Sequence, residues 1–303
     1  MARHLASLSV TAVLVAGLTA CSQSGSGTAG PSPSPSRTLS PAGSAAVVGE
    51  ADFTNAVFTS ASARVDNPWI ALKVGRQWDF RGSAIGDSGH RIPRRVVATV
   101  TDLTKDIHGI ASAVVYEEDF DQGQLVEAEL SFYAQDQAGN VWHLGEYPEE
   151  YEHGQFVKAP DWITGLKGAK AGVQMRVDPQ VGTSPYAEGF APPPLNWNDH
   201  ARVHRTGERV CVPTGCYRNV TDIEEYDPGQ PQAFQHKFYA AGIGNVRVGW
   251  SGAQEDEREV LRLVRLRQLT PAQQAQIRHQ ALALQASAYR RSPDVYGRTA
   301  PAH

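Results

Sequence analysis

Between residues 125 and 136 apolar and polar side chains alternate, and this alternation is the feature that most limits the possible folds of the chain. In the stretch LVEAELSFYAQD, one set of alternate positions is polar: Glu127, Glu129 and Ser131. Successive side chains of a β-strand point to opposite faces, so a period of two residues predicts a sheet with one apolar face and one face in water. The apolar set is Val126, Ala128, Leu130, Phe132 and Ala134.

Other stretches between residues 51 and 269 are similarly rich in Val, Ile and Leu, and turn signals such as Asp-Gln-Gly separate them. Examples are RRVVATVTDLT, HGIASAVVYEEDF and EREVLRLVRLRQL. Closely spaced strands with no helical period between them predict a mainly β domain over 51–269, built as a single antiparallel meander. A curved sheet, a half-barrel or a barrel would limit the number of exposed strand edges.

A C-terminal α-helix is predicted over 270–291. Thr270 and Pro271 are suited to the N-cap and the first helical position. Apolar residues then follow at helical spacing: Ile277, Ala281, Leu284 and Ala288. This pattern favours a helix docked on the sheet, and a free or partner-binding helix is the alternative. Residues 292–303 are predicted to be a disordered tail.

Two phrases of the sequence are nearly the same, FYAQDQAGNVWHLGE at 132–146 and KFYAAGIGNVRVGW at 237–250. In each, Phe-Tyr-Ala is expected to end one strand and Gly-Asn-Val to begin the next, with a gap of hairpin length between them. Trp142 and Trp250 would then cover the core from the return strands. The turns need glycines that can adopt positive φ. These are Gly139, Gly242 and Gly244.

The segment 147–197 differs from its surroundings, because it is dense in Gly, Pro, Trp and Tyr and shows little alternation. It is predicted to be a long excursion that leaves the sheet and packs over an edge or an open face. Long loops in compact domains are often functional, and an inert cover over a sheet edge is the alternative.

The first 20 residues resemble an export signal, with a basic start and an apolar run too short to span a bilayer comfortably. The sequence Leu-Thr-Ala-Cys that ends at Cys21 resembles the bacterial lipobox, in which the cysteine thiol receives a diacylglycerol. An anchor of two or three acyl chains holds a soluble domain stably on a membrane. The chain is therefore predicted to sit on the extracytoplasmic face of the cell membrane, with 21–50, rich in Ser, Gly and Pro, as a disordered tether.

The charge of the chain gives no case for nucleic acid as a partner. Its formal net charge is −4, and basic and acidic residues are interspersed without long runs. The predicted partners are the membrane, through the anchor, and an envelope lipid or protein.

Two cysteines remain after Cys21. Cys211 and Cys216 flank a Pro-Thr-Gly turn, and export would place them in an oxidising compartment. A disulfide across a hairpin is predicted. A redox or zinc site would need Cys-x-x-Cys spacing or further ligands nearby.

The segment DNPWIALKVGRQWDFRG at 66–82 resembles the opening Asn-Pro-aromatic-aromatic-Pro-Leu-x-x-Gly-x-x-Trp-x-Tyr stretch of a group of uncharacterised exported bacterial proteins. In that group the phrases AQD..GNVW..GE and KYYAPGVG.V follow later. The resemblance spans about 66–266 and departs at Ala71 and Phe80, where Pro and Tyr are usual. It implies the curved antiparallel sheet of envelope lipoproteins and no activity. The matching residues are Asn67, Pro68, Trp69, Leu72, Gly75, Trp78, Asp136, Gly139, Asn140, Val141, Trp142, Gly145, Glu146, Lys237, Tyr239, Gly242 and Gly244.

Candidate functional residues lie around the first repeated phrase: Tyr133, Asp136, Asn140 and Glu146. Two carboxylates and a tyrosine can perform acid–base chemistry if a cleft holds them close together. Alternatively, Asp136 caps the turn and Glu146 only begins the following segment.

No metal site and no cofactor are predicted. His200 and His204 are four residues apart and share a face, but a zinc site needs at least a third ligand within reach. His143, His153 and His236 are histidines that sequence alone cannot place.

These observations favour a lipid-anchored, extracytoplasmic, non-catalytic binding protein for an envelope lipid or protein. Two alternatives stay open. One is an envelope hydrolase that uses Asp136, Glu146 or a histidine. The other is a structural lipoprotein that docks a partner through its C-terminal helix.

Overall fold

The fold is taken from a computed structural model, which describes residues 50–86 and 88–303. The predicted signal segment, Cys21 and residues 22–49 of the predicted tether lie outside the described residues. Within the described part, no helix is both long and apolar enough to cross a membrane.

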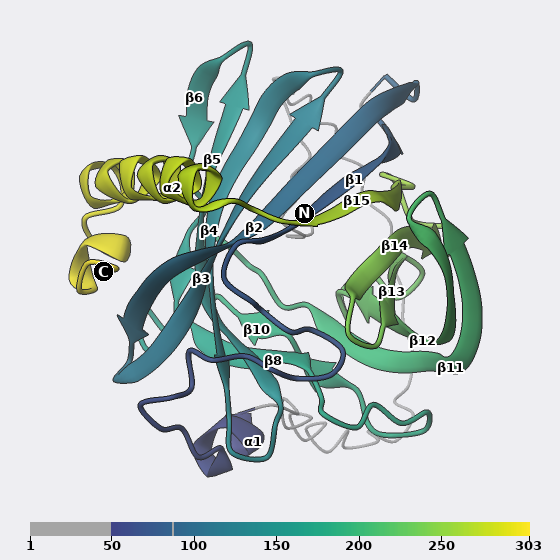
Figure 1. The fold of residues 1–303 in the computed structure, drawn as a ribbon, viewed down its shortest axis with the longest axis horizontal. Helices are drawn as coiled ribbons and strands as arrows, with labels where there is room; N and C mark the ends of the chain where they lie inside the picture. Colours follow the sequence, from purple (N-terminus) through teal and green to yellow (C-terminus); the bar gives the residue numbers. More distant parts are fainter. Residues whose placement is uncertain (1–49, 87) are drawn as a thin grey trace, which may run out of the picture.

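The described strands form one antiparallel sheet that curves strongly (Figure 1). Along the sheet the strand order is β10-β8-β5-β4-β3-β2-β1-β15-β14-β13-β12-β11-β9, with β6 and β7 paired to β5 off this path. The strands are β1 (Arg76–Ile85), β2 (Arg91–Ile107), β3 (Ile110–Asp121), β4 (Gln124–Gln135), β5 (Val141–Glu152), β6 (Gln155–Lys158), β7 (Trp162–Ile163), β8 (Lys170–Met175), β9 (Tyr186–Ala187), β10 (Gly189–Phe190), β11 (His200–Val212), β12 (Gly215–Tyr226), β13 (Phe234–Ala240), β14 (Gly244–Ser251) and β15 (Val260–Gln268).

Two meanders make up this sheet, β1 to β5 and β11 to β15, and the pairing of β1 with β15 joins them. The predicted mainly β fold is therefore confirmed, and among the predicted alternatives the structure has the open curved sheet. A short helix, α1 (Glu50–Asn55), precedes the first strand.

The segment 147–197 does not leave the sheet as predicted. It contains the end of β5 and five short strands, which pair with the sheet. β10 pairs with β8 at one end of the sheet, and β9 pairs with β11 at the other, so that Glu188 alone separates the two end strands in the chain. Strands of two residues are too short to show alternation, which is why the sequence looked irregular here.

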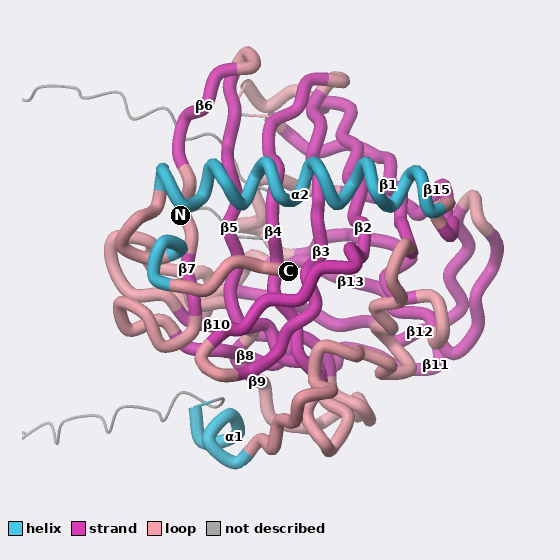
Figure 2. Tube along the Cα trace, turned by 60° about the vertical axis from the view of Figure 1, so that its left-hand side comes forward, coloured by secondary structure: helices cyan, strands magenta, loops and turns pink. Residues whose placement is uncertain are grey.

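The second helix, α2 (Pro271–Arg291), is long and lies across the outer face of β1 to β5 (Figure 2). Thr270 is its N-cap and forms a capping box with Gln273, while Pro271 occupies the first turn, as predicted. Ala281, Leu284 and Ala288 are buried, which confirms the docked helix.

The prediction of a disordered tail at 292–303 is wrong. The segment includes the short helix η1 (Tyr296–Arg298), and Tyr296 is 0% exposed. The Tyr296 ring packs against Phe132 and Tyr147, and the backbone of His303 exchanges two hydrogen bonds with Thr104. A buried aromatic ring and paired backbone groups fix a segment that composition alone suggests is disordered.

Both repeated phrases form hairpins, as predicted, and the segment that begins with Asn-Pro ties the two turns together. Asn67 Nδ2 donates to the Gly139 carbonyl (2.8 Å), and the Gly242 amide donates to the Pro68 carbonyl (2.7 Å). Trp78 Nε1 donates to the Ile243 carbonyl (2.8 Å). Several residues that carry the family resemblance, including Asn67, Pro68 and Gly242, therefore hold the two hairpin turns together.

The two tryptophans of these hairpins differ. Trp142 is buried, as predicted, but Trp250 is 40% exposed and does not cover the core. Arg258 lies over its ring instead. The residue that packs at the second turn is Trp78, from a different strand.

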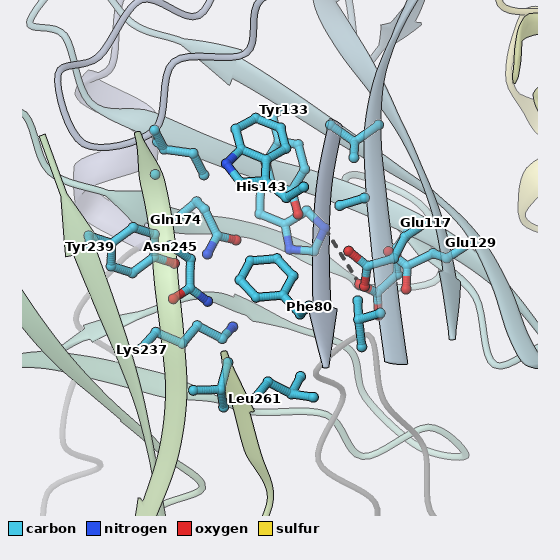
Figure 3. Close-up of a pocket in the computed structure, with 18 of the residues that line it drawn as sticks. Phe80, Glu117, Glu129, Tyr133, His143, Gln174, Lys237, Tyr239, Asn245 and Leu261 are labelled. Atoms are coloured by element: carbon cyan, nitrogen blue, oxygen red, sulfur yellow. Dashed lines mark ion pairs between the residues drawn. The ribbon is translucent and has the colours of Figure 1, made fainter. Parts of the chain in front are cut away.

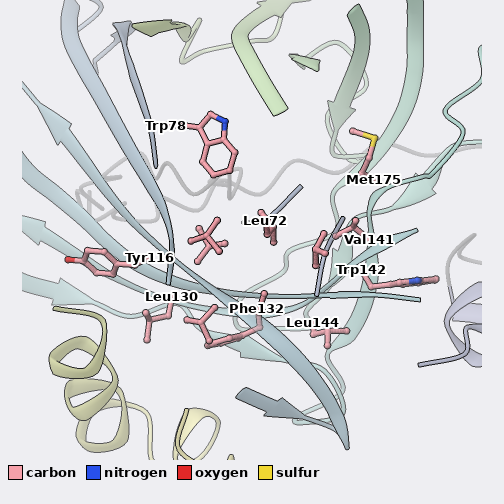
Figure 4. Close-up of a cluster of buried hydrophobic side chains, with 14 of the residues drawn as sticks. Leu72, Trp78, Tyr116, Leu130, Phe132, Val141, Trp142, Leu144 and Met175 are labelled. Atoms are coloured by element: carbon pink, nitrogen blue, oxygen red, sulfur yellow. The ribbon is translucent and has the colours of Figure 1, made fainter. Parts of the chain in front are cut away.

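The alternation of β4 divides its side chains between two faces of the sheet, as predicted, but the polar face does not lie on the molecular surface. Leu130 and Phe132 point to the outer face, near α2 and η1 (Figure 4). Glu127 and Glu129 lie on the concave face, and each is only 2% exposed. Curvature places this face inside the molecule, so the prediction of a solvated face is wrong.

Candidate functional site

A half-enclosed cavity of about 180 Å³ lies on the concave face of the sheet. That volume corresponds to roughly six water molecules at the density of the liquid. Part of its wall is apolar, from Trp78, Phe80, Val96, Val115 and Leu261. The rest is polar and carries Glu117, Glu129, Tyr133, His143, Glu146, Gln174, Glu188, Lys237, Tyr239, Asn245 and Glu259.

Strand pairing gathers these polar groups. Glu117 on β3 is directly opposite Glu129 on β4, and Tyr133 on β4 is opposite His143 on β5. Because residues two apart share a face, Glu129 and Tyr133 point into the same cavity. Figure 3 shows Glu117 and Glu129 on one side of it, with Lys237, Tyr239 and Asn245 on the other.

The carboxyl groups of the cavity are held away from bulk water, which disfavours their charged form. Burial, and the neighbouring Glu129, raise the pKa of Glu117 to about 8. Burial likewise raises the pKa of Glu129 to about 7. For Glu146, burial and then Glu129 raise the pKa well above its ordinary range. At neutral pH the cavity wall therefore holds a mixture of protonated and ionised carboxyl groups.

Lys237 is the cation among the lining residues. Its Nζ lies 2.8 Å from Glu225 Oε2. Burial alone would lower the pKa of Lys237, but the negative charges of Glu225 and Glu188 outweigh burial and raise it, so the amine stays charged. One ammonium group faces five lining carboxyl groups: Glu117, Glu129, Glu146, Glu188 and Glu259.

His143 is neutral in this site. Burial, followed by the charge of Lys237, lowers its pKa to about 3. Its Nε2 lies 3.5 Å from Glu146 Oε2, and its ring stacks on Tyr133 with the ring centroids 4.9 Å apart. The neutral ring can accept or donate a hydrogen bond, but it does not compensate the carboxylate charge.

Several buried polar atoms of the cavity wall form no hydrogen bond within the described part of the chain. They are His143 Nε2, Glu146 Oε1 and Glu188 Oε1, and each of these residues is more than nine-tenths buried. An unsatisfied buried polar atom typically costs about 1–3 kcal/mol. Such atoms beside a cavity indicate a site that water or a ligand completes.

The predicted site residues divide into two groups. Tyr133 and Glu146 line the cavity. Asp136 instead accepts hydrogen bonds from the Asn140 amide (2.9 Å), from Asn140 Nδ2 (3.1 Å) and from Trp142 Nε1 (2.8 Å). Asn140 in turn accepts a bond from the Val177 amide. Asp136 and Asn140 thus form the turn, and the structure does not bring Asp136 together with Glu146 in one site.

Sequence reasoning missed most of the acidic wall, including Glu117, Glu188 and Glu259. Glu129 was identified from the sequence, but it was predicted to lie on a face of the sheet in contact with water. Lys237 and Tyr239 were visible only as matching residues of the resemblance. The sequence signal for the acidic wall was the recurrence of acidic residues at alternate positions of neighbouring strands. This pattern indicates that they share a face of the sheet, but it does not indicate whether that face is buried or exposed.

The predicted disulfide is confirmed. Cys211 on β11 and Cys216 on β12 face each other across the hairpin and are bonded. The bond lies at a strand end, and neither cysteine lines the cavity.

No protein-family model matches the chain, and no curated protein matches it. Among solved structures, the chain is similar to a predicted exported protein with a YmcC-like fold from Bacteroides fragilis. The identity is 14%, the TM-score is 0.40, and the match covers 66% of this chain and 98% of that one. It is also similar to a predicted lipoprotein from Parabacteroides distasonis, with 10% identity, a TM-score of 0.36, and coverage of 67% and 100%. We therefore infer the function from the residues of the chain itself.

Proposed function

We propose that this chain is a lipid-anchored, extracytoplasmic binding protein whose concave cavity takes a small amphiphilic cation. The observation that carries the proposal is the composition of the cavity wall, which is apolar on one part and lined by buried, incompletely hydrogen-bonded carboxyl groups on another. An amine or quaternary ammonium group with a short apolar chain fits both parts.

Charge is the physical reason for this ligand class. A buried carboxylate is costly unless a cation pairs with it, and Lys237 is already paired with Glu225. A ligand cation would restore the ionised form of Glu117 and Glu129, whose raised pKa values keep them partly protonated near neutral pH. Binding should therefore release protons.

The test compares three probes of equal length and different head group: n-pentylamine, pentan-1-ol and pentanoate. Titration calorimetry should show the tightest binding for the amine and the weakest for pentanoate. Glu129→Gln should remove the preference for the amine. Glu118→Gln is the matched control, because Glu118 lies next to Glu117 on β3 and faces the other way, where it accepts from the Tyr116 hydroxyl. Equal binding of all three probes to the wild-type chain would refute the proposal.

An envelope hydrolase is the second candidate, because the neutral His143 lies beside Glu146 in the cavity. In such an enzyme the protonated Glu146 would be the general acid. Hydrolysis of an envelope ester or glycoside that Glu146→Gln abolishes, with unchanged stability, would favour this candidate. A partner docked on the apolar side of α2 is the least supported, since the sheet already covers that side.

The lipid anchor has its own test. Labelled fatty acid should enter the wild-type chain in a bacterial host and should not enter Cys21→Ser, which should leave the membrane fraction. Equal labelling of both chains would reject the anchor and leave the cavity proposal untouched.

A further inference from the structure

A second group of chemically capable side chains lies on the opposite face of the sheet from the cavity, on β11, β12 and β13. It consists of His204, Asp222, Glu224 and His236. Lys237 points into the cavity, and adjacent residues of a strand point to opposite faces, so His236 points away from it. The group is thus separate from the proposed ligand site.

The geometry of this group is that of a small coordination shell. His204, Asp222 and His236 each offer one ligand atom, and the three atoms lie within 4.8 Å of one another. Asp222 Oδ1 lies 3.0 Å from His236 Nδ1, and Glu224 Oε2 lies 3.4 Å from His204 Nδ1. Ligand atoms around a tetrahedral zinc ion lie about 3.4 Å apart, which is comparable with the spacing of these three atoms.

We propose that His204, Asp222 and His236 bind a divalent transition-metal ion such as Zn²⁺, with a water molecule as the fourth ligand. Glu224 Oε2, 3.4 Å from His204 Nδ1 and 3.8 Å from His236 Nε2, lies beside this site as a hydrogen-bond acceptor. Two imidazoles and one carboxylate suit zinc and its neighbours in the first transition series much better than Mg²⁺ or Ca²⁺, which prefer oxygen ligands alone.

The surroundings favour this assignment. Arg202 pairs with Oε1 of Glu224, while Oε2 is the oxygen nearest His204. Asp222 and His236 are buried, whereas the His204 side chain is 32% exposed, which gives an ion a path from solvent. Because the ligands come from three neighbouring strands, a bound ion would cross-link the end of the sheet that lies farther from α2.

The sequence showed only half of this site. It paired His204 with His200, but His200 is not a member of the group, and its Nδ1 contacts the Asn198 carbonyl. The fold supplies His236 and Asp222 instead, through the pairing of β12 with β11 and β13.

The experiment uses the full chain, freed of metal with EDTA and then titrated with ZnCl₂ or MgCl₂. Zinc at about 100 times its dissociation constant should raise Tm by roughly 5–10 °C, and magnesium should not. His204→Gln should weaken zinc binding at least tenfold by calorimetry and remove most of the Tm shift.

His200→Gln is the matched control, since it changes a histidine of the same strand outside the group and should keep the zinc effect. His236→Gln tests the buried ligand. If that variant does not fold, His204→Gln still tests the site, because the partly exposed His204 side chain can be replaced without disturbing the core. The proposal is overturned if zinc gives no shift in Tm, or if His204→Gln binds zinc as tightly as the wild-type chain does.

Discussion

The two faces of the β3–β5 region are built from the same strands and are opposite in character. The outer face is apolar and closed: Leu130 and Phe132 are at most 1% exposed and pack near α2 and Tyr296. The concave face is acidic and bounds a half-enclosed cavity, with Glu117 and Glu129 in the cavity wall. The outer face stabilises the fold. The concave face carries buried carboxyl groups that lower stability, and functional sites often retain such destabilising groups.

The largest effect is expected on the outer face. Phe132→Ala should lower the free energy of unfolding by about 3–5 kcal/mol, because it removes a fully buried ring and leaves a cavity against Tyr296. Urea unfolding of the wild type and of Phe132→Ala measures this change in the free energy of unfolding. A loss below about 1 kcal/mol would show that this face is less tightly packed than described.

The concave face should respond in the opposite direction. Glu117→Gln should raise the free energy of unfolding at pH 8 by about 2–4 kcal/mol, because the folded state holds this carboxyl at a pKa of about 8 against an ordinary 4.5. The folded state binds the proton more tightly, so Glu117 lowers stability as pH rises above 4.5, and the gain should be small at pH 5.

Urea unfolding of wild type and Glu117→Gln at both pH values checks this difference. Glu208→Gln, at a partly exposed position of β11, is the control and should change stability little at either pH. If Glu117→Gln destabilises the chain at pH 8, the acidic wall is a structural network and not a ligand site.

A smaller effect separates the two carboxylates that sequence analysis grouped together. Asp136→Asn should lower stability by about 1–2 kcal/mol, because one oxygen that accepts hydrogen bonds in the turn becomes a donor. It should leave pentylamine binding unchanged. Glu146→Gln should instead weaken the binding of n-pentylamine without lowering the free energy of unfolding. Thermal melts measure stability and calorimetry measures amine binding for both variants. If Asp136→Asn weakened amine binding, or if Glu146→Gln lowered stability, these assigned roles would be wrong.

The smallest effect concerns pH and the ligand. The affinity for n-pentylamine should rise about tenfold between pH 6 and pH 8, because Glu129, with a pKa of about 7, ionises in that range while the amine stays protonated. Glu117 and Glu146 on neighbouring strands, Lys237 on β13 and Glu259 also face this cavity and will broaden the transition. Calorimetry at four pH values is sufficient, and an affinity that falls as pH rises would exclude carboxylates as the binding groups.

Local features of the chain were predictable to the extent that they depend on neighbouring residues. The alternation over 125–136 gave the division of β4 between two faces, and Thr270 with Pro271 gave the start of α2. The repeated phrases gave both hairpins, since Gly139 and Gly244 adopt the positive φ that these turns need. The tail at 292–303 was missed because its order depends on a distant partner, the ring of Phe132.

The candidate sites were much less predictable. Of the four residues chosen from the first repeated phrase, Tyr133 and Glu146 reach the cavity, while Asp136 and Asn140 build the turn. All four lie within one short stretch, and only the orientation of each side chain relative to the sheet separates them. His204 and His236 meet because β11 and β13 are both neighbours of β12, and their sequence spacing does not indicate this.

The sequence by itself determined which side chains share a face and where strands turn, because the pleat of a strand and the φ requirements of a turn are local properties. Tertiary structure decided which face became the interior. Glu129 has the pattern of a solvated residue and is 2% exposed, because the sheet curves around that face and α2 covers the other. Curvature depends on the pairing of strands far apart in the chain, and the environment of each carboxyl group, and hence its pKa, follows from that curvature.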